Sequence, residues 1–133
     1  MNIKWLYWIA TVLLSLVYIG GGVFYLTSIP MVQGMFVQFG YPAYIVPILA
    51  VVKLFAAATI LSRVSVALSD LAYAGMFFHL ILAAGAHIGV GDPGFAPALV
   101  GLVLLVVSFL TQNAARRKQS PYGSMAALRG ASA

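Results

Sequence analysis

The chain contains no cysteine and only two acidic residues, Asp70 and Asp92. Without cysteine, thiol catalysis and a disulfide relay are excluded. Charged residues make up 7% of the 133 residues, apolar residues make up 63%, and the mean hydropathy is +1.05. Because a soluble surface of this size needs far more charge, the composition indicates an integral membrane protein.

Four apolar stretches approach the length of a membrane-spanning helix, about 20 residues. We expect spans at about residues 5–26, 42–61, 69–88 and 95–111. Short connections predict that neighbouring spans pack antiparallel. The predicted fold class is therefore all-α, an integral membrane four-helix bundle with short loops. It occupies residues 1–113, and a basic, flexible tail follows at 114–133.

The longest connection runs from Thr27 to Tyr41 and admits two interpretations. Ser28 and Pro30 form a helix-start signal. Four apolar residues then share one helical face opposite two glutamines: Met31, Met35, Phe36 and Phe39 against Gln33 and Gln38. This pattern predicts either an interfacial helix over the outer mouth of the bundle or an ordinary ordered loop. At the next connection, Asp70 is expected in the first turn of the third span, where an acid favours the helix dipole.

The basic residues outside the spans predict the orientation. In a four-span chain, six of the seven fall on one side: Lys4, Arg63, Arg116, Arg117, Lys118 and Arg129. The positive-inside bias then places both termini in the cytoplasm. The net charge of +5 is explained by topology and by contact with anionic lipid, and it requires no nucleic acid.

Lys53 is the seventh basic residue and lies near the middle of the second span, with no acid in that span. A lysine side chain about 15 Å from either end of the span cannot reach water by snorkelling. A charge at this depth costs about 2.5 to 3.5 kcal/mol on insertion scales, which marks the residue as a candidate functional site. The alternative is a structural role, in which Lys53 donates to hydroxyl groups and to freed backbone carbonyls. Pro47 in the same span is expected to leave the carbonyl of Ala43 without its helical donor.

Each predicted span carries one stripe of small or polar residues. In the first span the stripe is Thr11, Ser15, Tyr18, Gly22 and Tyr25, in the second Ala50, Lys53 and Ala57, in the third Gly75, His79, Ala83 and His87, and in the fourth Gly101, Ser108 and Gln112. In lipid such stripes mark helix contacts, because small residues allow close approach and hydroxyl groups find partners on other helices.

The depths of these residues predict one polar cluster. Lys53 and His79 lie near mid-membrane, and Tyr18 lies slightly toward the outer side. We expect these three to form a catalytic or binding centre that opens outward past Tyr25 and His87. The opening would lead toward Asp92, with Gln33 and Gln38 at the entrance.

The chemistry of this cluster has several possible forms. A neutral lysine acts as a base or nucleophile, whereas a charged one holds an anionic head group or a quinone oxygen. Proton transfer to His79 or Tyr18 is reasonable in both cases. No metal is expected: His87 lies about 12 Å along the helix from His79, so the two cannot ligate one ion.

Three segments resemble the DoxX-like family of small four-helix bacterial membrane proteins. They are GYPAY at 40–44, ILAVVKLFAAATIL at 48–61 and LAYAGMFFHLILAAGAHIGVGDP at 71–93. The resemblance covers about residues 7–110 and implies the bundle fold and a bacterial inner (plasma) membrane. The sequence departs from the family pattern twice, with Tyr25 where a lysine is frequent and His79 where an aspartate is common.

Three functions remain open, and the cofactor is unknown. The first is a module that binds a small lipophilic or quinone-like molecule, for example as a redox-linked accessory subunit. The second is a small membrane enzyme doing acid/base chemistry on a lipophilic substrate, and the third is a carrier or assembly factor without catalysis. Membrane lipid is a partner in each case, and a homo-oligomer is compatible with all three.

Overall fold

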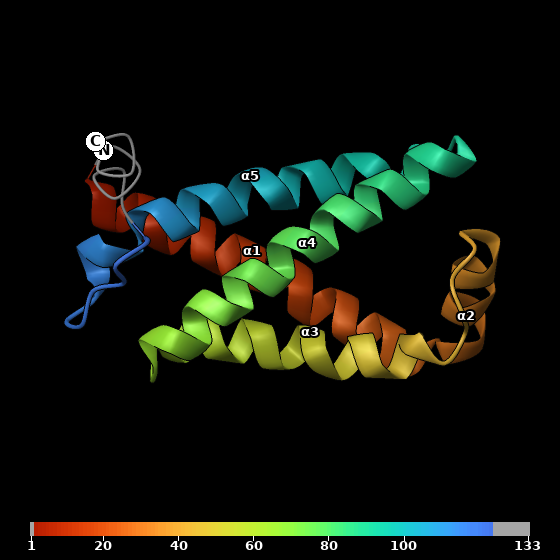
Figure 1. Cartoon of the computed structure of the whole chain (residues 1–133), viewed down its shortest axis with the longest axis horizontal. Coiled ribbons are helices and arrows are strands. Elements are labelled where there is room, and N and C mark those ends of the chain that lie inside the picture. The colour runs from red at the N-terminus through yellow and green to blue at the C-terminus, as the bar shows by residue number, and fades with distance from the viewer. Residues whose placement is uncertain (1, 124–133) are drawn as a thin grey trace.

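The computed structural model describes residues 2–123. Its elements are α1 (Ile3–Thr27), α2 (Ile29–Gln38), α3 (Ile45–Ser62), α4 (Val66–Val90), α5 (Phe95–Thr111) and the 3-10 helix η1 (Gln112–Ala115). The predicted all-α fold is confirmed, with no strand in the described part of the chain. The helices α1, α3, α4 and α5 (extended to Ala115 by η1) are long and apolar enough to cross a membrane. Figure 1 shows these four side by side, with α2 across one end of the bundle.

Two helix starts differ from the expected positions. Residues 41–44 form the turn before α3, so this helix begins at Ile45 and not at Pro42. The helix α4 begins three residues earlier than expected, because the hydroxyl of Ser65 accepts a hydrogen bond from the backbone N–H of Leu68 at 3.2 Å. The prediction that Asp70 lies in the first helical turn is therefore wrong.

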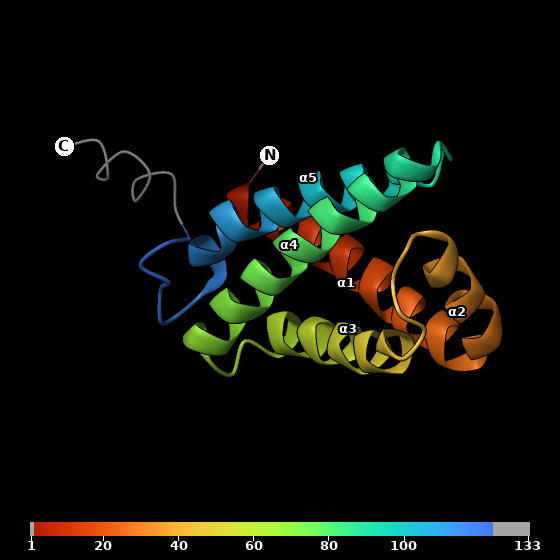
Figure 2. The ribbon, with the colours of Figure 1, turned by 45° about the vertical axis from the view of Figure 1, so that its right-hand side comes forward.

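The helix α1 is the centre of the packing, since it has extensive contact with both α3 and α5. The helix α4 packs mainly on α5, and its contact with α3 is the least extensive between neighbouring long helices. Figures 1 and 2 show why: α4 lies near α3 at the end remote from α2 and diverges from it toward α2. This divergence leaves room for the cavities described below.

The stripe predicted on the first span faces the interior of the bundle. Thr11, Ser15, Tyr18 and Gly22 are all buried. The hydroxyl group of Ser108 on α5 lies 2.6 Å from that of Thr11 and 2.6 Å from that of Tyr73 on α4. These hydrogen bonds join three helices inside the apolar core, as expected of hydroxyl groups in a membrane bundle.

The helix α2 confirms the helical interpretation of the connection between the first two spans. Its N-terminal boundary is Ser28 with Pro30 in the first turn, as the start signal predicts. Phe36 packs edge-on against Tyr25 of α1, with ring centroids 5.7 Å apart. The side chain of Gln33 donates to the carbonyl of Ala43 at 3.2 Å. Ala43 lies in the turn before α3, and its carbonyl also accepts from the backbone N–H of Val46 at 3.3 Å. The expectation that Pro47 leaves this carbonyl unpaired is therefore wrong, and the bond from Gln33 joins α2 to the turn before α3.

The first part of the predicted tail packs against the bundle. Ser120 is 3% exposed, and its hydroxyl donates to the carboxylate of Asp70 at 2.8 Å. The backbone N–H and carbonyl of Ser120 also bond the side chain of Asn113, each at 2.8 Å. The remainder of the predicted tail, with Arg129, lies outside the described residues.

Candidate functional site

Two adjoining cavities lie between α3 and α4, with volumes of about 370 and 940 Å³. The smaller lies beside α2 and the larger extends past the middle of both helices. Both are lined by Leu49, Gly75, Phe78 and His79. The remaining lining of each is mostly aliphatic and aromatic, which suits an apolar guest.

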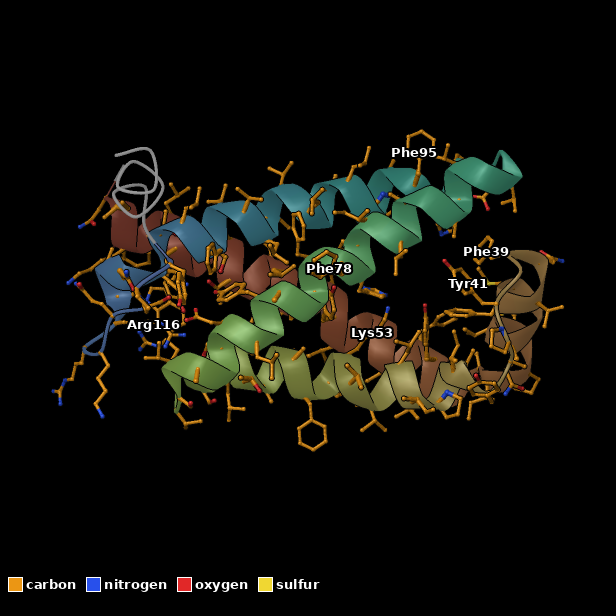
Figure 3. The ribbon with its side chains drawn as sticks, viewed as in Figure 1. Phe39, Tyr41, Lys53, Phe78, Phe95 and Arg116 are labelled. Atoms are coloured by element: carbon orange, nitrogen blue, oxygen red, sulfur yellow. The ribbon has the colours of Figure 1, made fainter. Side chains whose placement is uncertain are left out.

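Lys53 points into this space from the middle of α3, as Figure 3 shows. Its Nζ lies 4.2 Å from the centroid of the Tyr25 ring and 5.7 Å from that of the Tyr18 ring, both on α1. A Cβ at position 21 would come within 3.1 Å of Nζ, so Gly21 makes room for the amine. Among residues 2–123 the amine has no hydrogen bond or ion pair, and it makes cation–π contacts with these two rings.

His79 reaches the same place from α4. Its Nδ1 lies 2.9 Å from the hydroxyl oxygen of Tyr18, which also lies 3.2 Å from the carbonyl of Met76. A tyrosine hydroxyl has one proton to donate. When that proton goes to Met76, Nδ1 of His79 is the donor to Tyr18, and Nε2 remains as an acceptor. Tyr18 thus lies between the imidazole and the amine, so the structure brings together the three residues expected at the centre of the cluster.

The second histidine has a different environment, at the α2 end of α4. Its Nδ1 lies 2.6 Å from the Asp92 carboxylate, which also accepts from the backbone N–H of Gly94 at 2.6 Å. The N–H of Gly94 first, and the His87 side chain second, hold the pKa of Asp92 below its usual range. His87 lines the smaller cavity and packs against Phe39 at 4.8 Å between ring centroids. Asp92 does not line that cavity and instead stabilises the turn between α4 and α5.

The comparisons with known proteins add the family. A model described as the DoxX-like family matches residues 9–111. The chain belongs to the DoxX-like family. No curated protein and no solved structure matches it. The matched range of this DoxX-like protein contains every residue that lines the two cavities.

The resemblance predicts departures from the family pattern at Tyr25 and His79, and both residues lie at the cluster. The ring of Tyr25 covers one side of the Lys53 amine. His79 faces both cavities and bonds to Tyr18. Within residues 2–123, the surroundings of Lys53 therefore contain aromatic rings and an imidazole, and no carboxylate.

The two glutamines expected at the entrance lie on α2 and line neither cavity. The side chain of Gln33 is occupied by the carbonyl of Ala43, and Gln38 is exposed. The α2 residues that do line the smaller cavity are Phe36 and Phe39. In the sequence, Phe36 and Phe39 belong to the apolar face of the predicted helix. That face was expected to lie at the membrane interface.

Proposed function

We propose that this DoxX-like protein binds a lipophilic molecule with a polar head, of the quinone type, between α3 and α4. The head would lie beside Lys53, His79 and Tyr18, and the apolar part would fill the cavities. One observation supports this most strongly: the amine of Lys53 has no hydrogen-bonding partner among the described residues and lines an apolar cavity. Leaving a charged donor without an acceptor in the middle of a membrane-spanning helix costs free energy, which a carbonyl oxygen of the guest offsets.

The size and lining of the cavities suit such a guest. Ligand sites in proteins commonly enclose about 300 to 1,000 Å³, and both volumes fall in that range. A quinone presents two carbonyl oxygens on an apolar ring, so the amine can donate to one of them. In a redox-linked accessory subunit, a partner protein would supply the electrons and this chain would hold the ring.

The test is the content of the purified protein. Lipophilic molecules are extracted from the wild type and from Lys53→Met, and quantified by mass spectrometry. We expect one quinone-like species in the wild type and at least a tenfold loss in Lys53→Met, because a charged hydrogen bond is removed. Lys118→Met is the matched control, since Lys118 is exposed and lines neither cavity. Equal amounts of the species in all three proteins would contradict the proposal.

The hydrogen bond between Tyr18 and His79 favours a second candidate, acid/base chemistry on a lipophilic substrate. Here the amine or imidazole would take a proton from the bound molecule, and Tyr18 would lie next to the imidazole as a proton relay. Conversion of a bound species that stops in both Lys53→Met and His79→Leu, but continues in Lys118→Met, would support an enzyme. If both substitutions leave binding, conversion and growth unchanged in a folded protein, a carrier or assembly factor remains.

We also propose that the end of the bundle carrying the basic residues faces the cytoplasm of a bacterial inner membrane. The support is the positive-inside bias, since Lys4, Arg63, Arg116 and Arg117 gather at this end. The chain has no cysteine, so single cysteines report accessibility directly. A membrane-impermeant thiol reagent added to intact spheroplasts should label Gln38→Cys and not Lys118→Cys. The reverse pattern would contradict the orientation.

A further inference from the structure

Four cations line one hollow at the end of the bundle opposite α2. The hollow has a volume of about 360 Å³ and is lined by Lys4, Trp8, Arg63, Ala114, Ala115, Arg116 and Arg117. The two acidic side chains of the chain lie elsewhere. Asp70 bonds to Ser120, and Asp92 bonds in the turn between α4 and α5. In the described part of the chain, no acidic side chain therefore lines the hollow to balance its charge.

Arg63 is held at this hollow by an unusual backbone conformation. It ends α3 with φ 53° and ψ 30°, and it is the one non-glycine residue with positive φ in the described part of the chain. Its guanidinium lies 4.7 Å from the centroid of the Trp8 ring and donates to the carbonyl of Ala115. Three segments distant in sequence thus fix one cation. A left-handed arginine costs conformational energy, and such strain is concentrated at functional sites.

Arg116 supplies the observation that points to a ligand. Its Nε and Nη2 atoms are buried and have no hydrogen-bonding partner among the described residues. Figure 3 places this residue at the end of the bundle remote from α2. Buried guanidinium donors without acceptors are costly, and the planar fork that they form matches two oxygens of a phosphate or carboxylate.

We propose that this hollow binds the phosphate group of an anionic membrane lipid. Arg116 would hold the phosphate through its fork, with Lys4, Arg63 and Arg117 completing the positive surroundings. The hollow is lined by Lys4 and Trp8 in the first turns of α1, and the neighbouring Trp5 is 67% exposed, as expected of an aromatic residue near a membrane interface. The lipid tails would then lie along the exposed apolar residues of α1, which include Ile9, Val12 and Leu13. This site is separate from the cavity of Lys53 and does not depend on its function.

The experiment uses the full chain, purified in an uncharged detergent and stripped of lipid. Native mass spectrometry and thermal unfolding measure the binding of phosphatidylglycerol, phosphatidylcholine and inorganic phosphate. We expect the wild type to bind phosphatidylglycerol at least tenfold more tightly than phosphatidylcholine, and to gain little stability from inorganic phosphate. Arg116→Gln should lose at least tenfold in affinity, because a charge-assisted bidentate contact is removed. The control, Lys118→Gln, removes one charge just outside the hollow and should bind within about twofold of the wild type.

Two further variants keep the test decisive if Arg116→Gln does not fold. Arg116→Lys keeps the charge but loses the fork, and Arg117→Gln changes an exposed side chain of the same hollow. Both should fold and bind phosphatidylglycerol more weakly than Lys118→Gln does. Equal losses in all variants would overturn the site, because they would show only attraction to net charge. Stabilisation by inorganic phosphate equal to that by phosphatidylglycerol would overturn the assignment to a lipid.

Discussion

Single residues decide how closely the helices pack, and Gly22 is the clearest case. A Cβ at this position would lie 2.9 Å from the side chain of Leu54 and 3.1 Å from the carbonyl oxygen of Ala50. Both partners belong to α3, so the absence of a side chain at Gly22 permits the contact between α1 and α3. Two residues earlier, a Cβ at Gly20 would meet nothing within 4 Å.

We therefore predict that Gly22→Ala destabilises the protein by about 1–3 kcal/mol, since it overpacks a fitted contact. Gly20→Ala is the control and should be neutral or stabilising by about 0.5–1 kcal/mol, because alanine favours a helix more than glycine does. Unfolding in mixed micelles with increasing denaturing detergent measures both. A loss of stability in Gly20→Ala as large as that in Gly22→Ala would show that helix propensity, and not packing, sets the result.

Much of the cluster could be predicted at the scale of residues. The absence of acids in the second span, together with the depths of Lys53, His79 and Tyr18, led to the expectation that these three meet. The ring of Tyr25 as a cation–π partner of the amine could not be predicted, because it depends on side-chain rotamers and on the space above Gly21. The binding or catalytic roles of Lys53, His79 and Tyr18 stay predictions.

Among the helices, α4 differs most from its sequence interpretation. Its stripe of Gly75, His79, Ala83 and His87 was expected to contact another helix, but all four residues line the smaller cavity. The helix instead buries Met76, Leu80 and Ala84, and Leu80 packs beside Gly101 of α5. Periodicity shows which residues share a face of a helix. It does not show whether that face meets a neighbour or an open space.

The turn between α4 and α5 should respond to acid. The pKa of Asp92 is lowered in the folded protein, mainly by the N–H of Gly94, so the ionised carboxylate stabilises the turn. This contribution is fully present above the ordinary value of 3.8 and is lost as the pH falls toward the lower pKa of the folded state. The intrinsic exchange of backbone amides slows as the pH falls in this range, so, relative to that intrinsic rate, hydrogen exchange of residues 91–95 should accelerate as the pH falls below 3.8. In Asp92→Asn this extra acceleration should be absent, and its persistence would assign the effect to another group.

The arrangement of the whole molecule determines the size of the cavities. Gly75 lines both of them, and a Cβ there would meet nothing within 4 Å. A large side chain at this position can thus be accommodated without disturbing the helices. Gly85 lies further along the same helix, is also exposed and open, and lines neither cavity.

We predict that Gly75→Phe keeps the fold and reduces the co-purified lipophilic molecule at least tenfold, because the ring occupies the space of the guest. Gly85→Phe should keep both the fold and the guest. Circular dichroism and size exclusion check the fold, and mass spectrometry of extracts measures the guest. A normal content of guest in a folded Gly75→Phe protein would place binding outside this space.

The overall architecture was largely predictable, because four long apolar stretches with short connections leave few arrangements in a membrane. The uneven spacing of the helices was not predictable. This spacing depends on α4 packing mainly against α5. It also depends on the hydrogen bond from Gln33 to Ala43, which joins α2 to the turn before α3. Both features arise from specific contacts between consecutive elements, which hydropathy does not report.

The limited contact between α3 and α4 leaves a seam in the wall of the bundle, with the exposed ring of Phe78 on one side and that of Phe55 on the other. In a bilayer such a seam opens sideways onto the acyl chains. A guest of the kind proposed, with a tail much longer than the cavities, would therefore keep that tail among the lipids while its head lay beside the amine. Exchange with the pool dissolved in the membrane then needs no passage through water.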